Sequence, residues 1–509
     1  MDERIPAVAM RDITKRFGSV VANDKCWLNI YRGEILALLG ENGSGKTSLM
    51  NMLSGIYYPD EGSIAIDGKE VVIASPKDAF DLGIGMIHQH FKLVDVFTAA
   101  ENIVLGLPGK LDLAAASEKI KNICARYGFE IDVNQKVYDM SVSQKQTVEI
   151  VKVLYRGADI LILDEPTAVL TPQETDKLFA VLRVMRDDGK AVVIITHKMH
   201  EVEELSDRVA ILRKGQFVGD MLTKDTNAQE MTNHMVGRPV ELNIVRTEPE
   251  NVHPRIEVKN LTVRDEDGLL RLQNVSFVAN AGEILGIAGI SGSGQKELLE
   301  AIAGLQKTEA GSVLYYEDDG SQDELLGKDP VEIRRKGVTL SFVPEDRLGM
   351  GLIGNMDLSD NMMLRSYRKG NSFFTNRREP HTLAENVVDY LEIVTPSIET
   401  PVRRLSGGNV QKVLVGREIS MAPKVLLTAY AVRGLDINSS YTIYDLICEQ
   451  KEKGVAVVYV GEDLDVLVEL CDRILVLCGG KVSGIVDGRR TDKREIGSMM
   501  TILGGKAHE

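Results

Sequence analysis

The stretch GENGSGKTSL, which begins at Gly40, constrains the fold of this chain most. Its spacing is G-x-x-x-x-G-K-[ST], and it follows the strand-like run EILALL. Glycines at these positions allow backbone N–H groups to converge on phosphate oxygens, while Lys46 can reach terminal phosphates and the Thr47 hydroxyl can bind a magnesium ion. A plain glycine-rich turn is the alternative. The complete spacing, the strand before it and the helical SLMNMLSGI after it favour a phosphate-binding loop in an α/β core.

The same order of motifs occurs twice in the chain. A GEI segment, an apolar run, a glycine loop, a helix and a later Asp-Arg strand span residues 33–215 and again 282–480. A chain of 509 residues is also too long for one hydrophobic core. Periodicity is weak from about Asn227 to Pro254, which carries three prolines, so we place the linker in this stretch. The expected parts are a first domain at 1–240, a linker at 241–254 and a second domain at 255–509.

Composition excludes several classes of function. The net charge of −15 and the lack of a sustained Lys/Arg run argue against a nucleic-acid partner. Five scattered cysteines, odd in number and without metal-ligand spacing, indicate reduced thiols in the cytosol. Neither a secretory leader nor about eighteen uninterrupted apolar residues is present. We therefore expect a protein that is soluble or is held at a membrane by a partner.

The first repeat begins with short alternating segments. Residues 7–31 predict antiparallel strands, and GSIAIDGKEV predicts a hairpin that turns at Asp67-Gly68. The run GIGMIHQHF predicts a strand that ends in Gln89. Helical periodicity dominates from about residue 98 to residue 157, so we expect a mostly helical insertion there.

Two acids follow a strongly apolar strand in DILILDEPTAVLT. Asp164 and Glu165 are placed at the carboxyl end of a buried parallel strand, where doubly wound sheets bind ligands. Solvated acids in a turn are the alternative, which the apolar approach disfavours. The strand AVVIITH ends in His197. Phe17 could stack on an adenine face, or it could be an ordinary strand aromatic.

These motifs make the chain resemble, over essentially its whole length, a tandem ATP-binding-cassette subunit of a bacterial importer. The resemblance implies two P-loop NTPase cores, each with an antiparallel β subdomain and a helical signature subdomain. In cassette terms the glycine loop is the Walker A cradle, Gln89 is the Q-loop residue, and Asp164 and Glu165 are the Walker B acids. His197 is the switch histidine.

The resemblance also implies ATP and Mg²⁺ as ligands and a role for each residue. Lys46 and magnesium would neutralise the terminal phosphate, and Thr47, Asp164 and the mobile Gln89 would hold the metal. Glu165 would polarise the attacking water, a general-base role that is worth roughly 10²- to 10⁴-fold in rate. The catalytic set is completed by His197. The expected nucleotide contacts in the first repeat are Phe17, Gly40, Glu41, Asn42, Gly43, Ser44, Gly45, Lys46, Thr47, Ser48, Gln89 and Asp164.

The second repeat keeps the parts that approach a nucleotide from the opposite side. It has the signature LSGGN, of which Ser406, Gly407, Gly408 and Asn409 would contact phosphate, and a D-loop RGLD that ends in Asp436. A signature of this kind begins a helix, whose N–H groups can bind a phosphate. In the family that phosphate belongs to the nucleotide held by the other cassette.

The departures from the family pattern sort by site. In the second repeat the cradle, the acids, the switch histidine and the Q-loop residue are replaced by Gln295, Lys296, Ala429, Tyr430, Glu462 and Glu345. In the first repeat the signature is MSVSQ, with Val142 and Ser143 in place of glycines, and the D-loop ends in Thr171. Every intact part belongs to one composite site and every damaged part to the other. This sorting predicts head-to-tail association of the cassettes, within one chain or between chains, with one hydrolytic and one degenerate site. Whether the degenerate site still binds nucleotide stays open.

The resemblance places the protein at the cytoplasmic face of a membrane, where it would bind permease subunits and act with a solute-binding protein indirectly. The segments HQHFKLVDVFTAAENIVLG and PEDRLGMGLI resemble the nucleoside branch more than the ribose or galactose branch. Monosaccharides are the alternative cargo, and a heterocycle such as riboflavin is a further one. A soluble factor that acts on ribosomes would need two intact sites and a basic helical linker. A purely regulatory nucleotide-binding module is disfavoured by the complete catalytic set. The number of copies per complex stays open.

Overall fold

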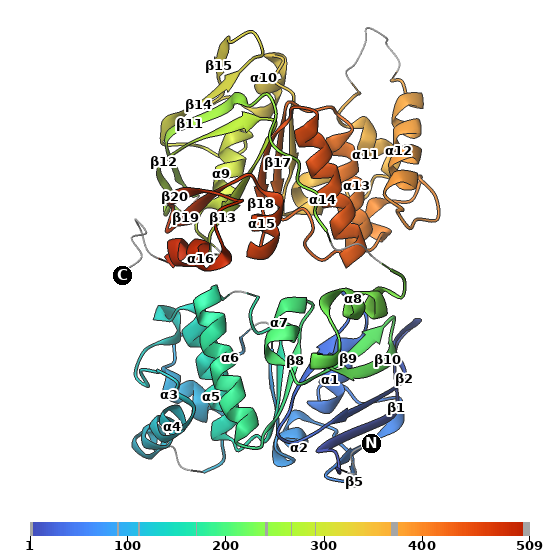
Figure 1. Ribbon diagram of the computed structural model, residues 1–509, viewed down its shortest axis with the longest axis vertical. Helices are drawn as coiled ribbons and strands as arrows, with labels where there is room; N and C mark the ends of the chain where they lie inside the picture. Colours follow the sequence, from blue (N-terminus) through green and yellow to red (C-terminus); the bar gives the residue numbers. More distant parts are fainter. Residues whose placement is uncertain are drawn as a thin grey trace. The chain divides into compact units, whose positions relative to one another are not determined.

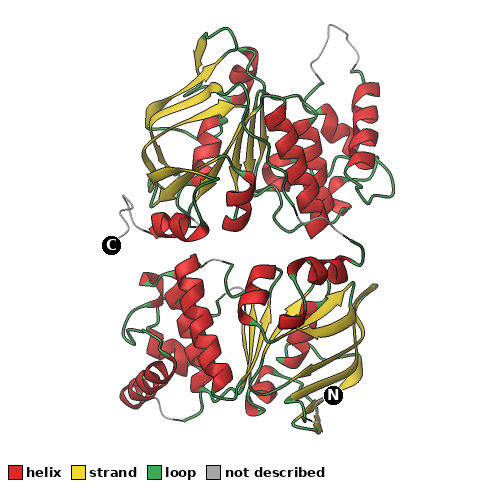
Figure 2. Cartoon of the chain, viewed as in Figure 1, coloured by secondary structure: helices red, strands yellow, loops and turns green. Residues whose placement is uncertain are grey.

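A computed structural model describes residues 4–88, 91–109, 112–168, 170–239, 243–265, 267–290, 292–367 and 375–501. The chain divides into two compact units, Met1–Glu241 (unit 1) and Leu242–Glu509 (unit 2). The described part of each unit holds a four-stranded antiparallel sheet, a six-stranded and mostly parallel sheet, and helices (Figures 1 and 2). The expected α/β class with two repeated domains is therefore confirmed.

The antiparallel sheet of unit 1 is built from the first strands of the chain. In spatial order its strands are β2 (Val20–Ile30), β1 (Val8–Phe17), β4 (Glu61–Ile66) and β5 (Lys69–Val71). The hairpin between β4 and β5 turns at Asp67 and Gly68, with φ of 46° and 79°. Positive φ at both central residues matches the right-handed twist of the two strands. The strands and the hairpin expected from the sequence are thus confirmed.

The second sheet of unit 1 carries the ends at which the candidate site lies. Its spatial order is β10 (Gln216–Leu222), β9 (Arg208–Arg213), β3 (Ile35–Leu39), β8 (Ala191–Ile195), β7 (Ile160–Asp164) and β6 (Ile84–Ile87). Every residue of β3, β7 and β8 is buried. Strands covered on both faces read as continuous apolar runs, which is why EILALL and DILIL lack alternation.

Two strands end earlier than the sequence suggests. The strand expected to reach Gln89 ends at Ile87, where its ladder with Leu163 of β7 ends, and Gln89 itself lies outside the described residues. The strand expected to end in His197 ends at Ile195. There the next residue, Thr196, donates its hydroxyl to Glu201 at 3.0 Å and so begins a turn.

The helical insertion expected between residues 98 and 157 is confirmed. It comprises α3 (Ala99–Val104), α4 (Leu113–Tyr127), a 3₁₀ turn at Val137–Asp139 and α5 (Val142–Tyr155), which share a core. Capping boxes at Thr98 and Ser141 start α3 and α5. The other helices of unit 1 are α1 (Lys46–Leu53), α2 (Pro76–Asp81), α6 (Pro172–Asp187), α7 (Met199–Leu205), the 3₁₀ turn Thr223–Asp225 and α8 (Ala228–Val236).

The first part of the stretch that was expected to lack periodicity is a helix. Asn227 caps α8 by accepting from Glu230 N, and Gly237 ends it with φ of 85°. Met231 and Met235 are fully buried on its inner face. The helix was missed because its apolar face is only two methionines wide.

Unit 2 repeats the same plan. Its antiparallel sheet has the order β12 (Leu270–Ala281), β11 (His253–Arg264), β14 (Ala310–Tyr316) and β15 (Gln322–Glu324). Its second sheet has the order β16 (Leu340–Val343), β17 (Val425–Ala429), β18 (Ala456–Val460), β13 (Glu283–Ala288), β19 (Arg473–Cys478) and β20 (Lys481–Asp487). Its helices are α9 (Gln295–Ile302), α10 (Pro330–Arg335), α11 (Leu358–Met363), α12 (Arg378–Tyr390), α13 (Gly407–Ile419), α14 (Ile437–Glu452), α15 (Leu464–Leu470) and α16 (Lys493–Thr501), with a π-helical turn at Arg347–Gly351 and a 3₁₀ turn at Val402–Arg404.

In each unit the helix that follows the glycine loop packs between the two sheets. Leu49, Met52 and Leu53 of α1 share one core with residues of β1, β2 and the strands of the parallel sheet. The corresponding face of α9 lies in the same position in unit 2 (Figure 1). Both glycine loops are therefore held rigidly by buried apolar contacts on their helix side.

The stretch before β11 packs on unit 2. Residues 243–252 form neither helix nor strand, but Ile244 is buried in the core of this unit. Arg246 donates to the carbonyl oxygens of Val468, at 3.1 Å, and of Cys471. Among the described helices, none combines the length and the apolar character that crossing a bilayer requires.

Candidate functional site

The glycine loop of unit 1 joins β3 to α1. Gly45 adopts φ of 96°, and a Cβ atom there would lie 2.4 Å from Ala22 O. A Cβ atom at Gly40 would lie 2.4 Å from both Leu212 O and the Ser44 hydroxyl oxygen. Any larger residue at either position would collide with backbone, so the glycines are required by the close approach of neighbouring chain segments.

Lys46 is buried inside this loop with 6% of its surface exposed. Its Nζ donates to Gly40 O at 2.6 Å and to Glu41 O at 3.0 Å. Burial lowers the pKa of this ammonium, while the nearby carboxylates of Glu165 and Asp164 raise it. A buried cation that is satisfied only by loop carbonyls can turn its protons toward an anion that enters the loop.

The Ser44 hydroxyl provides a test of whether the loop fits a phosphate. Its Oγ is buried and has no hydrogen-bond partner among the described residues. Buried polar atoms are nearly always satisfied, so an orphan hydroxyl in this loop fits a missing phosphate oxygen. Glu41, Asn42, Gly43 and Ser48, which were also expected to face nucleotide, are at least partly exposed.

Asp164 lies at the end of β7, beside the start of α1. The Thr47 hydroxyl donates to Asp164 Oδ2 at 3.2 Å. Burial raises the pKa of the Asp164 carboxyl, and the bond from Thr47 lowers it in part. One hydroxyl and one carboxylate from two elements therefore lie together, which is the oxygen donor set that Mg²⁺ prefers.

Glu165 follows Asp164 and accepts a hydrogen bond from His197. His197 Nδ1 lies 3.0 Å from Glu165 Oε1. This bond lowers the pKa of Glu165, against the effect of burial. The carboxylate is therefore held ionised and oriented by a side chain from the adjacent strand end.

The backbone at Glu165 is left-handed, with φ of 47°. Its N–H donates to Ile195 O at 2.9 Å. Tyr430, at the matching position of unit 2, has φ of 54° and donates to Val460 O at 2.9 Å. Because the unit that lacks the acid keeps the same conformation, this strained backbone belongs to the fold and not to the chemistry of the carboxylate.

A buried glutamate that the sequence patterns did not reveal supports the same loops. Glu201 on α7 is 2% exposed and accepts from the hydroxyls of Thr167 and Thr196, the second at 3.0 Å. Lys198 Nζ lies 3.2 Å from Glu201 Oε1, the oxygen that also accepts from Thr167. The turns after β7 and β8, which carry the acids and His197, are thereby joined. The burial of Glu201 could not be predicted from the sequence, because the residues at the start of α7 are mostly polar.

Phe17 lies at the end of β1 with 42% of its surface exposed. Its ring meets Tyr57 edge to face, with centroids 5.1 Å apart. The Lys15 ammonium lies over the same ring, 5.6 Å from its centroid, so the stacking of Phe17 on an adenine stays a prediction. The expected role of Gln89 falls outside the described residues.

The signature of unit 2 begins α13, as expected. Ser406 caps this helix. Its hydroxyl oxygen accepts from the backbone N–H of Asn409 at 3.4 Å and from the side-chain Nδ2 of Asn409 at 3.0 Å. Ser141 caps α5 of unit 1 in the same way. The local role of the serine is therefore shared, and the two signatures differ in the glycines after it.

The unit 2 residues at the positions of Lys46, Glu165, Gln89 and His197 make contacts of their own. Gln295 Nε2 donates to Ile290 O at 3.2 Å, so an uncharged amide occupies the loop. Burial raises the pKa of Tyr430 to about 12, which keeps the phenol neutral. Arg433 pairs with Glu345 at 2.5 Å and with Glu462 at 3.2 Å. At the positions of Lys46 and Glu165, unit 2 thus has an uncharged amide and a neutral phenol.

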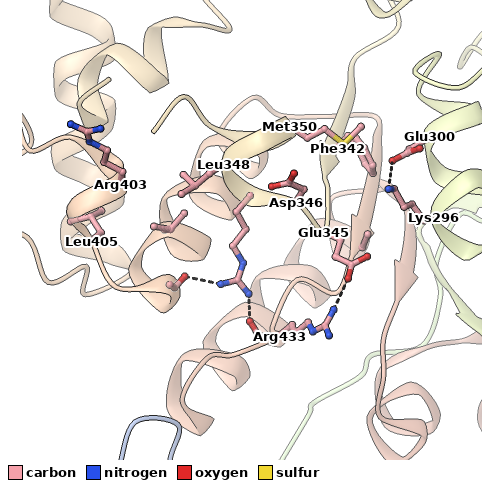
Figure 3. Close-up of a pocket in the computed structure, with 14 residues that line it drawn as sticks. Lys296, Glu300, Phe342, Glu345, Asp346, Leu348, Met350, Arg403, Leu405 and Arg433 are labelled. Carbon is pink, nitrogen blue, oxygen red and sulfur yellow. Dashed lines mark hydrogen bonds and ion pairs between the residues drawn. The ribbon is translucent and has the colours of Figure 1, made fainter. Parts of the chain in front are cut away.

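A pocket of about 750 Å³ opens beside these residues within unit 2 (Figure 3). Lys296, Glu345 and Arg433 lie on one side of it, and Leu348, Arg403 and Leu405 line the other. The pocket thus lies between the start of α9 and the segments near the signature.

Comparison with known proteins assigns the class. The fold and the site of unit 1 define a phosphate-binding cassette, and the sequence model of the ABC transporter family matches residues 24–168 and 272–428. The chain belongs to the ABC transporter family.

Similar proteins cover nearly the whole chain. It is 39% identical to the nucleoside import ATP-binding protein NupA of Lactococcus lactis subsp. cremoris, over 99% of each chain. It is 40% identical to the guanosine import ATP-binding protein NupO of Bacillus subtilis, over 97% of each. It is 38% identical to the ribose import ATP-binding protein RbsA 1 of Rubrobacter xylanophilus, over 97% of this chain and 98% of that one.

A solved structure of the archaeal ribosome recycling factor aABCE1, in complex with the ribosomal stalk protein aP1, has a similar fold. The TM-score is 0.59 at 17% identity, over 94% of this chain and 90% of that one. At this identity the likeness concerns the tandem fold alone.

Proposed function

We propose that this protein is the ATP-hydrolysing subunit of an importer and that hydrolysis takes place in unit 1. The observation that carries the proposal is the group formed by Thr47 with Asp164 and Glu165 with His197, at 3.2 Å and 3.0 Å, beside the buried Lys46. The full-length similarity to import ATP-binding proteins supports coupling to transport.

Each residue of the group has a chemical task. Lys46, Ser44 and the loop N–H groups would bind the phosphates, and Thr47 and Asp164 would hold Mg²⁺, with Gln89 as a further ligand. The metal, when bound, supplies charge neutralisation at the terminal phosphate. Glu165 orients the attacking water and accepts its proton, since its lowered pKa keeps it ionised at neutral pH.

In this proposal the signature of a second unit would form the opposite side of this site. Ser406, Gly407, Gly408 and Asn409 would approach the terminal phosphate, with the D-loop Asp436 nearby. The support is the sorting of intact and damaged motifs, which holds whether the second unit comes from the same chain or from another copy. The composite site formed by the other motifs would have negligible turnover because it lacks the lysine, the metal ligands and the base.

The cargo is a nucleoside, with a monosaccharide as the second candidate. Nucleoside and guanosine import proteins are 39% and 40% identical to this chain, and a ribose import protein is 38% identical. We place the protein peripherally at the cytoplasmic face of the membrane, bound to permease subunits, with a solute-binding protein acting outside the membrane.

Uptake of labelled guanosine and ribose tests the proposal in cells that lack this gene. The cells are complemented with wild type, with Glu165→Gln or with Glu204→Gln, an exposed control on α7. Guanosine uptake that is restored by wild type and by the control, but not by Glu165→Gln, is the expected result. If ribose uptake is restored instead, the transported substrate is a monosaccharide and the proposed mechanism stands. If Glu165→Gln restores uptake, the proposal that hydrolysis takes place in unit 1 is overturned.

A further inference from the structure

Arg347, in the segment PEDR, joins two functional loops of unit 2. It begins the π-helical turn Arg347–Gly351 and is half-buried. Its Nη1 donates to Gly407 O, in the signature, at 2.9 Å, and its Nη2 donates to Arg433 O, in the segment before the D-loop aspartate. One planar guanidinium thus fixes the distance between the signature and the D-loop.

Arg433 extends this connection to two acids. Its guanidinium lies 2.5 Å from Glu345 Oε1 and 3.2 Å from Glu462 Oε1 (Figure 3 shows the first contact). Glu345 follows β16 and Glu462 follows β18. The D-loop is therefore tied by ion pairs to the ends of two strands of the parallel sheet.

The packing around the two loops is close. A Cβ atom at Gly407 would lie 3.3 Å from Arg347 Nη1, so the first signature glycine leaves room for the guanidinium. A Cβ atom at Gly408 would lie 3.4 Å from Leu435 Cδ2. A side chain at position 408 would therefore approach the D-loop, as one at position 407 would approach Arg347.

Unit 1 has neither arginine. The offset between Gln89 and Glu345 places Phe91 opposite Arg347, and the offset between Asp164 and Ala429 places Ala168 opposite Arg433. Unit 1 is also the unit whose signature and D-loop are damaged. The arginine contacts therefore occur in the unit that keeps a signature and a D-loop and has lost its own catalytic groups.

We propose that Arg347 and Arg433 are positioning residues for hydrolysis in unit 1, because they hold the signature and the D-loop of unit 2 in one fixed arrangement. The inference rests on the proposed function. Unit 2 has Gln295, Ala429 and Tyr430 at the positions of Lys46, Asp164 and Glu165, so it lacks the phosphate-binding and metal-binding side chains that could order these loops from within unit 2. Fixed contacts from Arg347 and Arg433 replace that ordering, and preorganised groups lower the barrier of a reaction that needs exact geometry.

Steady-state ATP hydrolysis by the purified full chain tests the proposal. The variants are Arg347→Gln, Arg433→Gln and Arg433→Lys, with Arg377→Gln as a matched control. Arg377 is an exposed arginine of the same unit that pairs with Asp360 at 2.9 Å. We expect kcat to fall about 10- to 100-fold in both glutamine variants of the network, with partial recovery in Arg433→Lys and no change in the control. We expect the affinity for ATP without metal to change much less than kcat, because the phosphate cradle itself belongs to unit 1.

Hydrogen exchange separates positioning from general stability. We expect the amides of residues 407–410 and 433–436 to exchange faster in the glutamine variants than in wild type, and the amides of β17 and β18 to keep their protection. Faster exchange throughout β17 and β18, or unfolding of the variants, would overturn the proposal in favour of a stabilising role. If kcat is unchanged in both glutamine variants and Glu165→Gln abolishes hydrolysis, the role of the two arginines is overturned and the proposed function stands. Hydrolysis that survives Glu165→Gln would instead overturn the proposed function.

Discussion

His197 Nδ1 lies 3.0 Å from Glu165 Oε1, and this contact joins two neighbouring strand ends of the parallel sheet. In unit 2 the matching positions are Glu462 and Tyr430, and Glu462 pairs with Arg433 at 3.2 Å. A carboxylate and an imidazole placed in this way can orient a water and stabilise the charge that develops on the base.

Replacement of the base is expected to stop turnover and to spare binding. Glu165→Gln removes a proton acceptor and keeps the shape of the side chain, so kcat should fall by roughly 10²- to 10⁴-fold. Phosphate release at saturating ATP measures the fall, and equilibrium binding of ATP should match wild type. Glu204→Gln serves as the control. Turnover within threefold of wild type would show that another group accepts the proton.

Removal of the histidine should shift the titration of Glu165 upward. The bond from His197 lowers the pKa of this carboxyl below its ordinary value of 4.5. The hydrogen bond therefore adds to the free energy of unfolding above pH 4.5, the ordinary pKa of a glutamate. This contribution is lost as the pH falls through the lowered pKa of Glu165 in the folded state. In His197→Ala the pKa should therefore rise, because the largest effect that opposes burial is removed and only the charges of Lys46 and Lys198 still lower it.

A ¹³C carboxyl NMR titration of Glu165 in wild type, His197→Ala and His253→Ala checks this shift. His253 lies in unit 2 and serves as the control. An unchanged pKa in His197→Ala would mean that the hydrogen bond does not stabilise the ionised form.

The Thr47 hydroxyl should set the affinity for magnesium. Thr47→Val keeps the branched shape but removes the donor to Asp164 and one metal ligand, whereas Thr47→Ser keeps the hydroxyl. We expect the Mg²⁺ concentration for half-maximal hydrolysis to rise about tenfold or more in Thr47→Val and to stay within about twofold in Thr47→Ser. Equal Mg²⁺ dependence in both variants would exclude the threonine as a ligand.

Replacement of Glu201 by alanine is expected to lower the thermal stability of the protein. The Glu201 carboxylate is 2% exposed and accepts from Thr167 and Thr196, so Glu201→Ala leaves the two buried O–H groups without their acceptor. Each such group costs about 1–3 kcal/mol, which should lower the melting temperature by several degrees. Thermal unfolding followed by circular dichroism, with Glu204→Gln as the control, measures the effect. A melting temperature equal to that of wild type would contradict the role of this network.

The strands and the helical insertion were predictable because their signals are local. Buried runs such as EILALL, the Asp67-Gly68 turn and the cap at Ser141 need only a few neighbouring residues. The helix α8 was missed because it buries little more than Met231 and Met235. Strand ends were placed two residues too far, since a ladder ends where its partner strand ends, and the partner is distant in sequence.

The sequence by itself determined the repeat, the family resemblance and the sorting of intact and damaged motifs, because each motif is contiguous and its chemistry follows from residue type and spacing. The tertiary structure decided what the replaced residues do. Thr171 and Asp436 differ in the D-loop, yet both cap the helix that follows. Arg433 meets Glu345 across 88 residues of sequence. Such contacts depend on how strand ends converge at one edge of a sheet, a long-range arrangement that no local pattern encodes.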